Sequence, residues 1–318
     1  MNKPLSSTTR FTRLALLAGI LCAAALISCK KDEGPKAALP GDKVRTTFTL
    51  KINPQEQVFQ TYDDIDIEEP QTLLSDIWVL EFDSLGRSLA VASVDEHIVG
   101  QDLTVDLIAG KNLSVYVVAN AGSATFSTGM DLEAFKKATY DGRITQWDAL
   151  PLIGEANIDV EWHDARIEAP VAITAIGASV SAKFILQPDS GYELLTLQLK
   201  NAPKTYYYFS GMPVTAADVE NSAIISVLPD NLYTYTIPEN LQGIDPAITS
   251  PKDKVTDKPA TYFSLIARNT ATNKRVEFRL YPGDNVTNNF NINRNIRYIM
   301  TCNVNFDDPA DKRITVLE

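Results

Sequence analysis

The chain has 318 residues, with 29 basic and 40 acidic side chains and a formal net charge of -11 at pH 7. This acidic balance argues against nucleic acid or an anionic membrane surface as a partner, because both need a basic patch. Hydrophobic residues make up 45% of the chain, which is enough for two domains of ordinary size with separate cores.

Residues 1–28 have the pattern of a lipoprotein signal peptide. Basic residues near the start precede an apolar run at residues 14–27, as in a secretory signal. The run is too short to remain as a spanning helix, which needs roughly 20 apolar residues. It leads into Cys29 through a sequence that resembles the lipobox of lipoprotein signal peptidase. We expect lipidation of Cys29 and anchoring to the outer membrane; an ordinary signal peptide with a chance cysteine is the alternative.

Residues 29–43 predict a lipidated, flexible tether. They contain lysines, acids, prolines and glycines without apolar periodicity. The segment Lys30-Lys31-Asp32-Glu33 resembles the surface-export signal of Bacteroidales lipoproteins, which favours display on the outer face. After removal of the signal and lipidation of Cys29, only Cys302 would remain as a thiol. No intramolecular disulfide would then be possible, so stability must come from burial.

Residues 44–165 predict a first β-sandwich domain. Val44, Phe48, Leu50 and Ile52 share one side at period two and predict a strand over residues 44–52. Further strands are expected at residues 77–82, 88–94, 103–108 and 113–119, and one short helix at residues 132–139 with Asp131 as its N-cap.

Residues 166–318 predict a second domain of the same kind. Its strands are expected at residues 171–176, 179–186, 193–200, 206–209, 232–237, 260–267, 275–281 and 296–306. In the first half, turn residues recur at intervals of about 10 residues, which is typical of a sandwich or barrel. We therefore predict an all-β chain of two antiparallel β-sandwich domains.

The residues that could carry chemistry do not form a recognisable motif. His97 and His163 lie far apart in the sequence and have no neighbouring pattern of metal ligands. Residues 63–69 are mostly acidic, but their spacing does not match a calcium loop, so a solvated loop is the preferred interpretation. We expect no metal, no cofactor and no enzymatic activity.

Residues 206–209 form the most aromatic stretch, Tyr-Tyr-Tyr-Phe. Stacked aromatic rings can bind sugars, but alternate side chains of a strand face opposite sides. We therefore favour packing in the core and at an edge over carbohydrate binding.

Five longer strings become informative together. They are residues 76–83, 115–120, 151–154, 237–243, and the run from 280 to 298 that includes Asp284, Asn289, Arg294, Asn295 and Tyr298. In this order they resemble strings of fimbrillin-type proteins, the type V pilus subunits of Bacteroidales, and the resemblance covers nearly all of the mature chain. Each string also has a plain structural interpretation. In particular, the asparagines of residues 285–295 are expected to cap backbone groups in turns.

The resemblance implies two tandem transthyretin-like sandwiches and assembly with other pilus subunits by strand exchange. In that scheme the first strand is removed by a protease, and the groove accepts a strand from the next subunit. The candidate removable or self-complementing strand carries Val44, Phe48, Leu50 and Ile52. The candidate donor strand, near the end of the chain, carries Ile314 and Val316.

One feature departs from the family pattern. Shaft subunits are cut after an arginine beyond the first strand, but this chain has no arginine between Arg45 and Arg87. The candidate processing residues are therefore Arg45, which we place before the strand, and Lys51. The alternatives are cleavage by another protease, retention of strand and lipid as in an anchor subunit, and a tip or accessory adhesin.

The leading hypothesis is a structural or accessory subunit of a fimbrium that contributes to adhesion to host or bacterial surfaces. The alternative is a surface-exposed glycan-binding lipoprotein made of two β-sandwiches. Exposed coplanar aromatic rings in one cleft would favour the second hypothesis.

Overall fold

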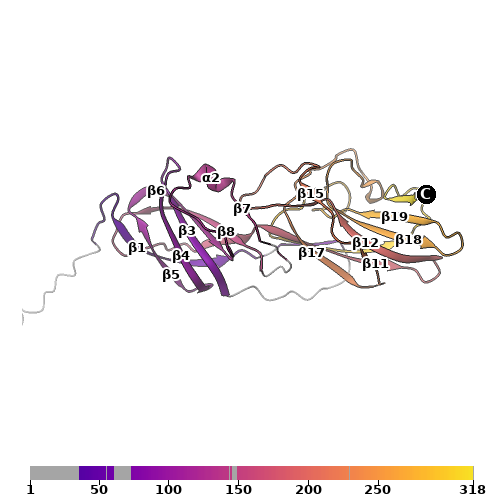
Figure 1. Cartoon of the computed structure of the whole chain (residues 1–318), viewed down its shortest axis with the longest axis horizontal. Coiled ribbons are helices and arrows are strands. Elements are labelled where there is room, and N and C mark those ends of the chain that lie inside the picture. Colours follow the sequence, from indigo (N-terminus) through magenta and orange to yellow (C-terminus); the bar gives the residue numbers. More distant parts are fainter. Residues whose placement is uncertain are drawn as a thin grey trace, which may run out of the picture. The chain divides into compact units, whose positions relative to one another are not determined.

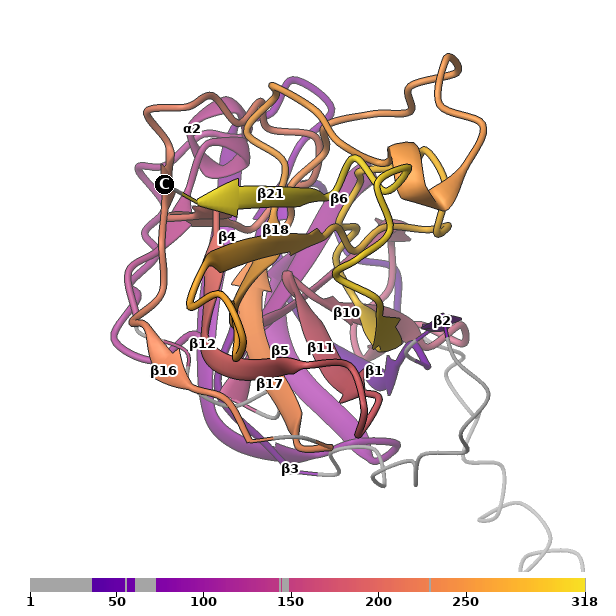
Figure 2. The same cartoon turned by 90° about the vertical axis from the view of Figure 1, so that its right-hand side faces the viewer.

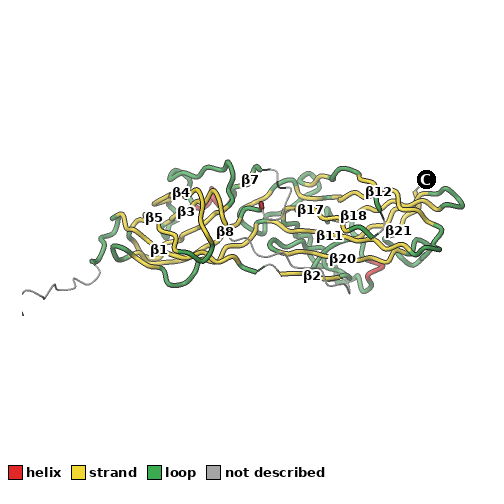
Figure 3. Tube along the Cα trace, turned by 90° about the horizontal axis from the view of Figure 1, so that it is seen from below, coloured by secondary structure: helices red, strands yellow, loops and turns green. Residues whose placement is uncertain are grey.

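The computed structural model describes residues 36–54, 56–60, 73–142, 144, 149–228 and 230–317. Strands dominate these residues (Figures 1 and 3), so the predicted all-β class is confirmed. The expected signal peptide, Cys29 and the first part of the tether lie outside the described residues, as does the acidic run at residues 63–69.

A first group of strands surrounds one hydrophobic core. Its members are β1 (Lys43–Ile52), β3 (Leu73–Phe82), β4 (Ser88–Ile98), β5 (Asp102–Ile108), β6 (Gly110–Ala119), β7 (Thr139–Tyr140), β8 (Leu152–Val160), β9 (Ala165–Arg166) and β10 (Val171–Ala175). The hydrogen-bonded order is β4-β3-β6-β8-β10-β1-β5, with β9 also paired to β1 and β7 paired to the short strand β14 (Tyr206–Tyr207). Both ends of this order, β4 and β5, are therefore edge strands.

Both faces of β3 are buried. Trp78, Leu80 and Phe82 alternate with Val79 and Glu81, and successive side chains of a strand point to opposite faces. The Phe82 ring contacts Tyr116 and Phe135, the latter from helix α2 (Leu132–Lys136). The N-cap of α2 is Asp131, as predicted, and its side chain accepts a hydrogen bond from Ala134 N.

Glu81 is a carboxylate inside the first core. Its side chain is fully buried, and its Oε2 accepts a hydrogen bond of 2.8 Å from the amide of Ile108 at the end of β5. Its Oε1 has no hydrogen-bond partner in the structure. Burial raises the pKa of Glu81 to about 7, and the bond from Ile108 opposes this rise.

A second group of strands forms two sheets around a second core (Figures 1 and 2). One sheet has the order β17-β11-β20-β2, and the other β16-β12-β18-β19-β21. Their bounds are β2 (Glu56–Gln60), β11 (Gly177–Leu186), β12 (Tyr192–Lys200), β16 (Ile225–Ser226), β17 (Leu232–Pro238), β18 (Tyr262–Asn269), β19 (Arg275–Leu280), β20 (Ile296–Val304) and β21 (Ile314–Leu317). The short pair β13 (Ala202–Pro203) and β15 (Val219–Glu220) and the 3-10 turn η2 (Pro251–Asp253) lie in its connections.

The sheets are mixed, whereas the sequence predicted purely antiparallel sandwiches. Strand β20 pairs in parallel with both β11 and β2, and β1 pairs in parallel with β10. After β1 the chain crosses to the second group, where β2 pairs in parallel with β20. It then returns to the first group to form β3. Strand β2 was not predicted, and it belongs to a sheet that the sequence assigned to the second domain.

The chain passes from the first core to the second near residue 177, and Tyr206 and Tyr208 return to the first core. Strand β10 lies beyond the expected boundary at residue 165, yet its Val171 and Ile173 belong to the first core. The second core begins with Ala178 in β11. Both cores belong to one compact unit that starts at Ala38, so the domain limits 44–165 and 166–318 stay predictions.

Asn295 connects both groups of strands. Its backbone N–H donates to Gly177 O at 2.7 Å, and its Oδ1 accepts from Ala175 N at 3.3 Å. Its Nδ2 donates to Pro54 O, two residues after β1, at 3.3 Å. Asn295 has a φ of 58°, a left-handed conformation that asparagine tolerates better than most residues. One side chain therefore holds the end of β10 and the connection between β1 and β2.

Arg294 makes a second connection between the two groups. Its guanidinium donates to the carbonyl oxygens of Tyr208 and Tyr207 at 2.6 and 3.2 Å. Its Nε lies 3.4 Å from a carboxylate oxygen of Glu239, and both charged side chains are largely buried. The planar guanidinium suits such a site because its donors point in fixed directions.

The loop before Arg294 is held by side-chain amides, and the predicted capping is confirmed. Asn285 Oδ1 accepts from the backbone amides of residues 287, 288 and 289. Asp284 accepts hydrogen bonds from Asn289, Asn293 and the Tyr298 hydroxyl. The asparagine-rich string is therefore an ordered loop that leads into the connection between the two groups.

We predict that Glu81→Gln removes a pH dependence of stability. Between about pH 4.5 and 7 the folded state keeps a proton on Glu81 that the unfolded state has lost. Wild-type stability therefore falls as the pH rises through this window, by about 3 kcal/mol. Chemical unfolding at a series of pH values measures this slope. The exposed substitution Glu133→Gln should keep it, and equal slopes in wild type and Glu81→Gln would contradict the assignment.

We predict that Arg294→Ala lowers the free energy of unfolding by about 2–4 kcal/mol, because it leaves Glu239 buried without its partner. Arg294→Lys should recover less than half of this loss, since one ammonium cannot reproduce the three contacts. The matched control is Arg268→Ala, which breaks an exposed pair with Glu193 and should cost at most about 1 kcal/mol. Thermal unfolding distinguishes them, and equal losses at both arginines would refute the structural role.

Candidate functional site

Strand β1 lies inside its sheet although it is the first described strand of the chain. Residues 43–49 pair antiparallel with β5, and residues 50–52 pair in parallel with β10. Val44 and Phe48 are 0% exposed and Leu50 is 1% exposed, while Ile52 is half-buried. The sequence periodicity thus predicted the buried side of this strand correctly.

The first core depends strongly on β1. Burial of a side chain such as Val, Leu or Phe contributes about 1.5–3 kcal/mol, so Val44, Phe48 and Leu50 together approach the net stability of a whole domain, ~5–15 kcal/mol. Removal of β1 would expose Leu103, Leu107 and Ile173 on the neighbouring strands, all of them nearly fully buried. A replacement strand would therefore be needed to keep such a chain folded.

Both candidate processing residues lie within β1. Arg45, which the sequence analysis placed before the strand, is its third residue and pairs with Asp106 of β5. That placement was wrong: the predicted strand at residues 44–52 already contained Arg45, and the antiparallel ladder with β5 starts at Lys43. Lys51 has an exposed side chain near the end of β1, where it pairs with Ala172. A cut after Arg45 would leave most of β1 in place, whereas a cut after Lys51 would separate nearly all of it.

The candidate donor residues lie apart from β1, in the second group of strands. Ile314 and Val316 belong to β21, which pairs antiparallel with β19 at the edge of its sheet (Figure 2). Ile314 packs partly against the second core, and Val316 is 59% exposed. Strand β21 has four residues and one neighbour, so few interactions hold it in place.

The aromatic stretch at residues 206–209 packs as the sequence suggested. Tyr206 and Tyr208 are buried, and Phe209 packs against the first core. The Tyr208 and Phe209 rings both contact Phe135. These three side chains serve the core, so they do not form an exposed platform for a sugar.

The histidines lie in unrelated surroundings. His97 is part of β4, and His163 Nε2 lies 3.8 Å from an Asp42 oxygen at the surface. In the described part of the chain, no group of three or more His, Cys, Asp or Glu residues could hold a metal ion. None of the helices among these residues has the length and apolarity that a membrane span requires.

The residues that connect β1 to the second group were not predicted from the sequence. Val58 in β2 and Asn295 were not assigned a role in the site, although Asn295 belonged to a quoted string. A short alternation in Gln57-Val58-Phe59 after Pro54 was the available signal for β2. Glu81 was also missed, because a carboxylate in a strand usually indicates an exposed face.

Residues 233–302 match a family described as Domain of unknown function (DUF4906). This segment includes Glu239, Asp284, Arg294 and Asn295, and therefore most of the connection between the two groups of strands. No curated protein matches the sequence.

The fold of the chain is similar to the folds of solved fimbrial proteins. The tip fimbrial protein Mfa3 from Porphyromonas gingivalis, solved with a C-terminal truncation, shares 15% identity at a TM-score of 0.53, covering 87% of this chain and 98% of that one. A fimbrilin (fimA) from Porphyromonas gingivalis W83 shares 13% identity at a TM-score of 0.52, covering 86% of this chain and 95% of that one. At these identities the comparison shows the fold: this chain has the fold of fimbrial proteins.

Proposed function

We propose that this chain is a structural or accessory subunit of a fimbrium, exported as a lipoprotein through Cys29 and joined to other subunits by strand exchange. The observation that carries the proposal is the place of β1, the first described strand, which lies between β5 and β10 and buries its side chains in the first core. The fold shared with a tip fimbrial protein and a fimbrilin supports the same role. Adhesion to a host or bacterial surface would be a property of the assembled fimbrium.

In this proposal the chain contains both a site that accepts a strand and a strand that is donated. The acceptor would be the gap between β5 and β10, whose core residues are otherwise covered by Val44, Phe48 and Leu50. The donor would be β21, which a single neighbour holds. Main-chain hydrogen bonds and alternating side-chain pockets would form the joint.

The position of Arg45 within β1 limits where a protease could cut to remove this strand. Cleavage there would release the lipid and leave the strand that fills the gap. Lys51 is the last basic residue before Arg87, so a protease specific for basic residues would have to cut at Lys51 to open the gap. Otherwise β1 stays, and the chain acts as an anchor, tip or accessory subunit that receives no strand at this place.

The mature N-terminus tests the proposal. Mass spectrometry of the protein recovered from the cell surface should find either an acylated Cys29 or a start just beyond Lys51. The first result assigns an anchored subunit that keeps β1, and the second assigns a polymerising one. Cys29→Ala should abolish incorporation of labelled palmitate. A mature chain that starts at residue 29 without lipid, or at residue 46, would contradict the proposal.

The donor assignment has its own test. We expect a chain that lacks residues 314–318 to fold but to stay out of polymers, because it has no strand to insert. The truncation keeps Arg313, whose guanidinium lies 4.8 Å from the centre of the Phe278 ring. Thr315→Ser, at an exposed position of β21, is the control and should assemble normally. Polymer formation by the truncated chain, seen by electron microscopy, would reject the donor assignment.

A further inference from the structure

Strand β4 has an unprotected edge. It has 11 residues, pairs with β3 on one side, and has no strand on the other side among the described residues. Its segment Leu89–Val94 contains no charged residue, glycine or proline. Proteins usually block such edges with lysine, proline or a bulge that turns the strand away. The ladder with β3 is irregular at Leu89, where the pairing shifts between Glu81 and Phe82. From Ala90 to Val94 the edge has none of these features, so this part can pair with another strand.

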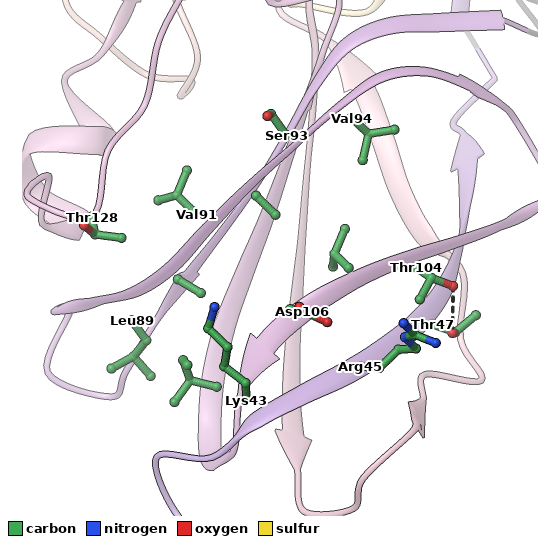
Figure 4. A pocket seen from close by; sticks show the side chains of 14 residues that line it. Lys43, Arg45, Thr47, Leu89, Val91, Ser93, Val94, Thr104, Asp106 and Thr128 are labelled. Atoms are coloured by element: carbon green, nitrogen blue, oxygen red, sulfur yellow. Dashed lines mark hydrogen bonds between the residues drawn. The ribbon is translucent and has the colours of Figure 1, made fainter.

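The free edge of β4 borders an open groove of about 860 Å³ (Figure 4). Six consecutive residues of β4, Leu89–Val94, line it, and β1 and β5 supply the other wall. Ala90 and Ala92 pair with Glu81 and Val79 of β3, so they share the face that points toward β5. The small side chains of these two alanines do not cover the edge of β4.

The charges around the groove lack partners. Lys43 and Arg45 line the wall that β1 supplies, and Figure 4 shows Lys43 on the side of Leu89. Asp95 and Glu96 follow the uncharged segment of β4 and are exposed. Among the described residues, no ion pair is formed by any of these four side chains. Lys43 thus lies toward one end of the edge, and Asp95 and Glu96 lie at the other.

We propose that β4 is an interaction surface for a second copy of this chain, with two β4 strands paired antiparallel about a two-fold axis at Ser93. In this register Ala90 faces Glu96 of the partner subunit, and Val91 faces Asp95 of the partner subunit. Like charges directly opposite each other would be destabilising, and this register places none in that position.

The proposed register brings groups of opposite charge together across the interface. Ala90, Ala92, Val94 and Glu96 share one face of β4, because they alternate along the strand. Glu96 of the partner subunit therefore reaches the end of the groove that Lys43 lines. The two-fold axis repeats this contact, so a self-complementary surface results. The pairing needs neither removal of β1 nor release of β21, and it is independent of strand exchange.

A disulfide at the axis tests the register. In a Cys302→Ser chain from residue 30 onward, which contains the compact unit from Ala38, Ser93→Cys should give a covalent dimer on mild oxidation. Facing residues have Cβ atoms about 4.5–5.5 Å apart. The matched control is Asp95→Cys on the same strand, whose two copies would lie about 14 Å apart, too far for a disulfide. We expect at least tenfold more dimer from Ser93→Cys, and equal yields would overturn the register.

Charge reversal tests the interface without cysteines. Lys43→Glu should weaken the dimer at least tenfold, and the double variant Lys43→Glu, Glu96→Lys should restore it. Ser93→Lys, at an exposed position, should give a folded monomer because two ammonium groups meet at the axis. Sedimentation equilibrium measures each, with circular dichroism as the check on folding. A wild-type chain that remains monomeric at high micromolar concentration, or a double variant no stronger than the single one, would overturn the proposal.

Discussion

The first core depends on the pairing of β1 with β5 and β10. The buried apolar side chains Val44, Phe48 and Leu50 of β1 cover the core at these neighbours, so the core cannot be complete without a strand in this place. A cut between β1 and β2 would separate β1 from the strands that follow it, which the proposed strand exchange requires.

The second constraint is the connection between the two groups of strands. The Asn295 side chain is hydrogen-bonded to the backbone of Pro54 and Ala175, and the Arg294 guanidinium donates hydrogen bonds to the carbonyl groups of Tyr207 and Tyr208. These two residues belong to the segment that matches a known family. Since β2 pairs with β20 directly after this point, a cut in the connection after β1 would leave the new chain end attached to the second group.

Edge strands decide which surfaces can meet another chain. Strands β4, β5 and β21 each have one neighbour, and they differ in what protects them. Strand β5 carries Asp102 in an ion pair with Arg166, and β21 is short. The central segment of β4 combines length with a lack of charge, so this edge offers a favourable site for pairing.

The sequence by itself determined the all-β class, most strands, the buried side of β1 and the N-cap of α2, because these depend on local alternation and capping. It also predicted the amide capping in the asparagine-rich loop. Only the tertiary structure decided that β2 crosses to the second group, that β20 pairs in parallel and that Glu81 is buried. These features depend on which strands become neighbours, and side-chain alternation identifies a strand without identifying its partner.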